Sequence, residues 1–137
     1  MNNIIHITFN AQPTAKQRSR KGGNHWYNPQ AEEMNIIKRS VKDQLPEGFT
    51  IIKSNIPVTV NINWFIQPSK SMGTKKFIDL IKNDDIPHTI KPDRDNLDKF
   101  ALDCMSKIIF NDDCQIYDGR LSKYWSTDPR TEIEIIW

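Results

Sequence analysis

The feature that most constrains the fold is a strict alternation of apolar and polar residues in the middle of the chain. Val58, Val60, Ile62 and Trp64 are separated by single threonine or asparagine residues. A period of two places the apolar side chains on one face, so we expect a half-buried strand over residues 57–66. A β-sheet is therefore part of the fold.

Two other segments have the spacing of amphipathic helices. In residues 29–45 apolar side chains recur every three or four positions, with Pro29 suited to the first turn and Pro46 after the end. The same spacing predicts a helix over residues 94–108, in which Cys104 is a core residue.

The remaining segments complete a small domain. β-Branched and aromatic runs predict strands at residues 4–9, 115–126 and 131–137. With 137 residues there is room for one ordinary domain. The order β-α-β-α-β-β predicts an α+β fold, a single domain over residues 1–137 with one mixed or antiparallel sheet and two main helices.

Two stretches are expected to lie outside these elements. Residues 12–28 hold several glycine, proline and asparagine residues and predict a long loop. Residues 67–92 form a basic excursion with a short helix at 75–82, and a loop of that length is often functional.

Several protein classes are excluded. The longest apolar runs fall far short of the roughly 20 residues of a membrane helix, and the N-terminus lacks the pattern of a secretory signal. We expect a soluble protein in the cytoplasm, without a membrane partner. Cys104 and Cys114 are too few for a disulfide scaffold and are expected to be reduced thiols.

Charge is distributed unevenly along the chain. Residues 1–31 contain four basic residues and no acid, whereas residues 93–137 contain six basic and ten acidic residues. One interpretation is ordinary surface patterning. The other is a polyanionic ligand whose phosphate meets carboxylates through a metal ion.

The acidic segment has a definite arrangement. Asp93 and Asp95 stand at the start of the predicted 94–108 helix, Lys99 lies one turn beyond Asp95, and Asp112-Asp113 follow in a turn. Helix capping and turn formation explain each acid singly. Converging carboxylates would instead require a cation, and all-oxygen ligands favour magnesium or manganese over zinc.

Local structure alone would leave Asp113 distant from Asp93 and Asp95. A straight helix of roughly 14 residues separates Asp113 from Asp93 by about 20 Å. Only the tertiary fold can bring them together, most simply if the strand that follows Cys114 runs back along the helix.

The motifs in this region resemble those of the RusA-like Holliday-junction resolvases. D-x-D-N-L-x-K at 93–99, F-x-x-D at 100–103 and D-D-x-Q-I at 112–116 carry the resemblance, and the early K-x-R-x-R with Tyr27 is similar to the phage-type branch. The resemblance implies a homodimeric, Mg²⁺-dependent crossover junction endodeoxyribonuclease, with Mn²⁺ as a substitute. Such an enzyme resolves four-way DNA junctions by paired symmetric nicks during recombination and repair.

The resemblance also assigns residues. The essential acids correspond to Asp93, Asp95 and Asp113, with Asp112 as the alternative to the third, and the essential lysine corresponds to Lys99. The acids are expected to hold one or two Mg²⁺ ions that activate a water and stabilise charge on a scissile phosphate. Lys99 would contact that phosphate or orient the water.

DNA contacts are expected from basic side chains before the acidic segment and at its start. The candidates are Lys16, Arg18, Arg20, Lys21, Lys75, Lys76, Lys91 and Arg94. His25, Trp26 and Tyr27, beside the first four, could stack on unpaired bases. A plain solvated loop is the alternative.

Two other functions remain open from the sequence. The chain could be a non-catalytic DNA-binding or packaging accessory protein, in which the acidic turn serves structure alone. It could also be a nuclease that acts on other branched DNA.

Overall fold

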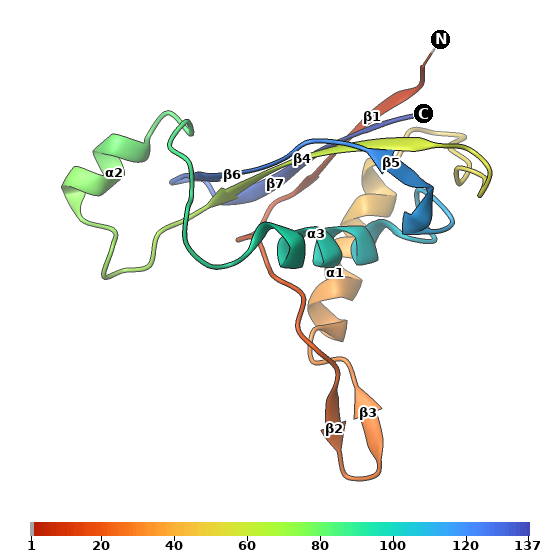
Figure 1. The fold of residues 1–137 in the computed structure, drawn as a ribbon, viewed down its shortest axis with the longest axis horizontal. Helices are drawn as coiled ribbons and strands as arrows, with labels where there is room; N and C mark the ends of the chain where they lie inside the picture. The colour runs from red at the N-terminus through yellow and green to blue at the C-terminus, as the bar shows by residue number, and fades with distance from the viewer. Residues whose placement is uncertain (1) are drawn as a thin grey trace.

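The computed structural model describes residues 2–137 and is built around one mixed sheet (Figure 1). Its strands are β1 (Ile4–Phe9), β4 (Val58–Ile66), β5 (Ile116–Asp118), β6 (Leu121–Trp125) and β7 (Arg130–Ile136). β7 lies between β1 and β4 and is antiparallel to both, while β5 and β6 both pair in parallel with β4. The predicted α+β fold with a mixed sheet is confirmed.

The two faces of the sheet differ as the alternation in the sequence requires. Ile62 pairs with Ile133 and Val60 with Ile135 on the buried face, and Trp64 is only 1% exposed. The opposite face is polar and lines an open hollow of about 320 Å³. Its side chains include His6, Thr8, Asn61, Asn63, Glu132 and Glu134. One face of the sheet therefore carries the core.

The two main helices, α1 (Ala31–Gln44) and α3 (Arg94–Met105), lie on the same side of the sheet (Figure 1). The buried residues of α3 are Leu97, Phe100, Ala101, Cys104 and Met105, the spacing of one helix face. α2 (Lys75–Ile81) is the short helix predicted within residues 67–92, and Thr74 caps it by accepting a hydrogen bond from Phe77 N at 3.2 Å.

The predicted end of the second main helix is wrong by three residues. α3 ends at Met105, and Lys107 takes a φ of +69°, in the left-handed region. Ile109 then accepts a backbone hydrogen bond from Ile52 N at 2.8 Å, and both Ile109 and Phe110 are fully buried. A contact with a segment distant in sequence thus outweighs the helical periodicity.

The predicted loop at residues 12–28 contains a hairpin. β2 (Arg20–Gly22) pairs antiparallel with β3 (His25–Tyr27) in a separate two-stranded sheet that projects from the body (Figure 1). Gly23 has a φ of +63° in the connecting turn, a conformation that glycine adopts readily. Three of the residues that favoured a loop in the prediction, Gly22, Gly23 and Asn24, lie at or beside this turn.

The strand predicted over residues 115–126 is divided. A single 3₁₀ turn (Asp113–Gln115) precedes β5, and Gly119 separates β5 from β6. At Gly119 the chain passes so close to β4 that an added Cβ would lie 1.9 Å from the Val60 carbonyl oxygen. Only glycine fits this break without movement of the backbone.

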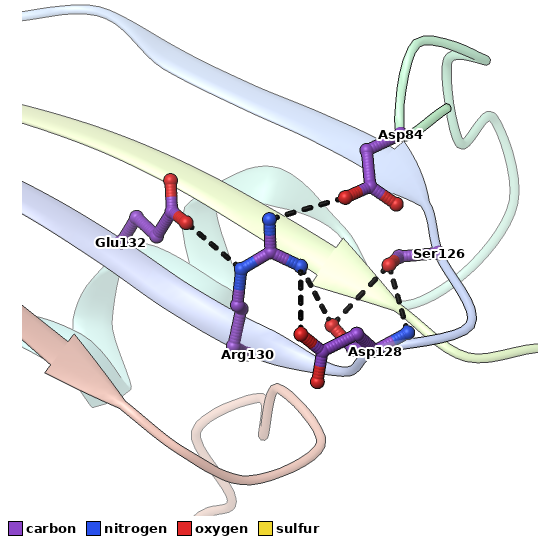
Figure 2. A network of polar contacts seen from close by, with 5 residues as sticks. All are labelled: Asp84, Ser126, Asp128, Arg130 and Glu132. Carbon is purple, nitrogen blue, oxygen red and sulfur yellow. Dashed lines mark hydrogen bonds and ion pairs between the residues drawn. The ribbon is translucent and has the colours of Figure 1, made fainter. Parts of the chain in front are cut away.

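The excursion over residues 67–92 is tied to the sheet by Arg130 (Figure 2). Its guanidinium contacts Glu132 at 2.8 Å and Asp84 of the excursion at 3.1 Å, and lies 4.0 Å from the centre of the Phe65 ring. Burial lowers the pKa of Arg130, but the bonds to Glu132 and Asp84 outweigh that effect and raise it. Nearby, Ser126 holds the turn through a bond from Asp128 N at 2.9 Å.

Two smaller expectations can be compared with the structure. Cys104 is buried, Cys114 is exposed, and both are free thiols, as predicted. None of the helices within residues 2–137 combines the length and apolar character needed to cross a bilayer.

We predict that Gly119→Ala lowers the free energy of unfolding by about 1–3 kcal/mol, because the new methyl group overlaps the backbone of β4. Urea unfolding followed by tryptophan fluorescence measures the change. Ser122→Ala in β6 is the control, since its hydroxyl makes no side-chain hydrogen bond within residues 2–137. Equal stability of Gly119→Ala and the wild type would contradict this close approach.

Candidate functional site

The N-terminus of α3 displays two of the predicted acids. Asp93 occupies the N-cap position with an extended backbone, but its carboxylate makes no capping hydrogen bond and lies 3.5 Å from Lys91 Nζ. Asp95 is in the first turn, 72% exposed, with Lys99 Nζ at 3.9 Å. Capping therefore does not account for Asp93.

β6 fixes the position of this helix start. The ammonium of Lys123 donates hydrogen bonds of 2.8 Å to the carbonyl oxygens of Ile90 and Pro92, and Arg94 donates to the Leu121 oxygen at 3.1 Å. Burial lowers the pKa of Lys123, and the neighbouring Asp93 acts in the opposite direction. The strand that follows Cys114 does run back along the helix, as expected from the sequence.

Asp95 and Asp98 on α3 and Asp113 in the 3₁₀ turn form a group of carboxylates that we call the acidic face. Burial raises the pKa of Asp98, and the negative charges of Asp113 and Asp95 raise it further. Asp113 likewise has a raised pKa, first from partial desolvation of its carboxylate, then from the adjacent carboxylate of Asp112 and the charge of Asp103. The fold thus brings Asp113 into the electrostatic neighbourhood of the helix.

The adjacent aspartates 112 and 113 have different environments. Asp112 caps the 3₁₀ turn by accepting a hydrogen bond from Cys114 N at 2.9 Å, which lowers its pKa. Its backbone N–H donates to Gln115 Oε1 at 3.0 Å, and Gln115 is anchored to the Lys53 oxygen at 2.6 Å. Asp112 therefore has a structural task, whereas the exposed Asp113 carries no such cap.

Asp93, Asp95 and Asp113 do not together form a metal-binding cluster. Within residues 2–137, no three histidine, cysteine, aspartate or glutamate side chains are grouped so that they could hold a metal ion. The donor chemistry still fits magnesium, since Mg²⁺ usually binds through one or two carboxylates and completes its coordination with water and substrate phosphate. Asp95 or Asp113 can supply such a carboxylate.

Lys99 borders a basic groove on the other side of the helix. Lys16, Gln17, Arg18, Ser19, Asn96 and Lys99 line this α3 groove, which has a volume of about 400 Å³. A backbone hydrogen bond of 2.9 Å from Lys16 N to the Asn96 oxygen and a 2.8 Å ion pair between Lys16 and Asp103 hold its walls together. The helical repeat places Lys99 between Asp95 and Asn96, so it adjoins both the acidic face and the groove.

The other predicted DNA-binding residues are dispersed. Arg20 and Lys21 lie on the projecting hairpin, while Lys75 and Lys76 lie on α2 at a different corner of the molecule (Figure 1). Lys91 and Arg94 remain beside the helix start in the contacts given above. The structure therefore brings Lys16 and Arg18 next to Lys99 but leaves α2 apart.

Sequence reasoning missed three residues of this site. Asp98 stands three positions after Asp95. This spacing places both side chains on one side of the helix and could have indicated that Asp98 belongs to the acidic face. Asp103 belongs to the F-x-x-D motif, but its partner Lys16 is 87 positions away. Lys123 has no local signal, because its partners at Ile90 and Pro92 belong to another segment.

Comparison with known proteins gives two matches. A family model described as Endodeoxyribonuclease RusA matches residues 9–136. The uncharacterized protein YqaN of Bacillus subtilis (strain 168) is 29% identical over 138 aligned residues, which cover 96% of this chain and 94% of the relative. Both matches extend over nearly the whole domain, including the α3 groove and the acidic face.

We predict that Lys123→Met loosens the start of α3, because two carbonyl oxygens lose a charged donor while the aliphatic stem is kept. Hydrogen–deuterium exchange of residues 90–97 should accelerate, and the free energy of unfolding should fall by about 1–2 kcal/mol. Lys70→Met, at an exposed position in the excursion, is the control. Unchanged exchange in residues 90–97 would show that Lys123 does not anchor this segment.

Proposed function

The chain belongs to the RusA endodeoxyribonuclease family, and from that premise we propose that it resolves four-way DNA junctions with the help of a divalent metal ion. The observation that carries this proposal is the position of Lys99. It lies between a groove lined by basic and polar residues and a row of carboxylates on the same helix. Metal-assisted hydrolysis of a phosphodiester needs a place for the anionic strand and carboxylates that can hold a cation beside the reacting phosphate.

In this proposal the DNA backbone lies in the α3 groove. Lys16 is held in place by Asp103, while Arg18 is exposed and can donate to a phosphate. Lys99 is 63% exposed and 3.9 Å from Asp95. Its ammonium can therefore turn toward a phosphate that lies between the α3 groove and the acidic face. There it would supply positive charge where negative charge develops during the reaction.

The proposed Mg²⁺ ion, for which Mn²⁺ could substitute, would bind to one or two carboxylates among Asp93, Asp95 and Asp113 and complete its coordination with water and the DNA phosphate. When bound, the ion would supply Lewis-acid stabilisation of the phosphate and lower the pKa of an attacking water. Asp98, next to Asp95 and Asp113, adds negative charge that favours a cation there. The chain's own residues position the strand and balance the charge of the site.

The proposed active form is a homodimer. One site on a domain of this size can cut one strand, whereas resolution of a junction requires two symmetric cuts. A twofold axis in the protein would match the twofold symmetry of the junction.

We predict that the purified protein nicks a labelled four-way junction only when Mg²⁺ or Mn²⁺ is present. Asp95→Asn should abolish cleavage and leave junction binding within about threefold, because it removes a proposed metal ligand but no DNA contact. Gel analysis of the labelled strands and a mobility-shift assay measure the two properties. Asp43→Asn on the outer surface of α1 is the control and should cut like the wild type.

Each outcome of this experiment bears on a different function. Binding without metal-dependent nicks from the folded wild type would indicate a non-catalytic DNA-binding protein. Equal rates on flaps, forks and junctions would indicate a general branched-DNA nuclease. A cruciform plasmid reports on the dimer, since paired nicks within one encounter yield linear DNA and single nicks yield open circles.

We also predict that Lys99→Ala lowers the rate of junction cleavage by about 100-fold or more, as expected when one charged donor to a transition state is removed. Its stability should change by less than about 0.5 kcal/mol, because the exposed pair with Asp95 contributes only a few tenths. Single-turnover cleavage and urea unfolding measure the two effects. Arg39→Ala in α1 is the matched control; a merely structural Lys99 would leave the cleavage rate intact.

A further inference from the structure

The projecting hairpin continues directly from the α3 groove. Ser19 is the last groove residue along this segment, and β2 begins at the next position. The hairpin is short, stands apart from the main sheet (Figure 1), and belongs to the part of the chain, residues 1–31, that contains no acid. DNA bound in the groove would therefore have this hairpin as its neighbour.

The two aromatic side chains of β3 point to opposite faces of the hairpin. Arg20 pairs with Tyr27, and the Tyr27 ring lies across Gly22, where an added Cβ would come within 3.2 Å of it. Lys21 pairs with Trp26 on the other face. The Tyr27 ring thus lies against its own hairpin, whereas Trp26 is on the opposite face with Lys21 as its cross-strand partner.

Trp26 differs from the other tryptophans of the chain. It is 68% exposed, while Trp64 and Trp125 are 1% and 7% exposed and Trp137 packs edge-on against Phe49. Its indole pairs with no aromatic ring within residues 2–137. The flat apolar indole of Trp26, with the Lys21 cation as its cross-strand partner, suits a ligand that has a flat ring and an anionic group next to it.

We propose that Trp26 is a stacking platform for an unpaired DNA base, with Lys21 beside it to contact the adjoining phosphate. The inference rests on the proposed function, since it deepens the description of the substrate: the preferred DNA has a base free of its stack next to the groove. Every base offers a π-face, so such stacking selects unpaired structure without selecting sequence. Tyr27 and His25 act in this arrangement as parts of the hairpin scaffold.

The test is binding to two duplexes without divalent metal, so that no DNA is cut. One duplex carries a single unpaired 2-aminopurine, and the other carries the same base paired. Wild-type protein should quench the fluorescence of the unpaired probe. Trp26→Ala should lose the quenching and weaken binding to the bulged duplex by about 5- to 150-fold, with less than a twofold effect on the paired duplex.

Charge and stacking are separated by the salt dependence of binding. Trp26→Ala should leave the slope of log affinity against log salt unchanged, whereas Lys21→Gln should reduce it by about one and retain the quenching. Trp26→Phe should restore much of the affinity for the bulged duplex. Ile36→Ala, which removes an exposed apolar side chain from α1, is the matched control and should behave like the wild type.

Equal affinity of Trp26→Ala and the wild type for the bulged duplex would overturn the inference. A loss of the same size on the paired duplex would overturn it too, because it would indicate a hairpin that enters a duplex groove. Junction cleavage by the wild type is measured separately. If the wild type cleaves the junction and Trp26→Ala binds the bulged duplex as tightly as the wild type, this inference alone is rejected. If the wild type does not cleave the junction, the proposed function is rejected.

Discussion

The arrangement of the site depends on how the N-terminus of α3 is attached to the sheet. Lys123 of β6 donates to two carbonyl oxygens of the segment before the helix, and Arg94 donates back to β6. These bonds join segments that lie about thirty residues apart in sequence. Because they set where Asp93 and Asp95 stand, the position of these two acids relative to the groove depends on them.

The same packing explains how opposite charges share the exposed surface of one helix. The buried face of α3 holds the core, so its polar residues share the remaining surface. Carboxylates occupy one side of that surface, and Lys99 separates them from the groove that Lys16 closes through Asp103. A mutually repelling set of acids attracts a cation, while the groove beside it attracts a phosphate backbone.

Two parts of the molecule extend beyond this scaffold, and they are attached differently. The excursion with α2 returns to the sheet through Arg130 and Asp84 (Figure 2) and through the backbone of His88, which donates to the Lys123 oxygen at 3.0 Å. The hairpin is held by its own ladder, by the Tyr27 ring over Gly22 and by a hydrogen bond of 3.4 Å from Arg20 to Gln17 Oε1. Such a lightly attached element can adjust to a ligand at low cost to the core.

Local spacing alone determined the strand at 58–66, the two main helices and the placing of Asp93, Asp95 and Lys99 at one helix start, because these features depend on side chains a few positions apart. Tertiary structure decided where α3 ends and that residues 20–27 form a hairpin beside a groove. It also decided that Asp113 lies close enough to Asp98 for its charge to raise the pKa of that carboxyl. Those features depend on contacts between segments that are distant in sequence. Local residue spacing does not predict such contacts, because they form only when the chain packs.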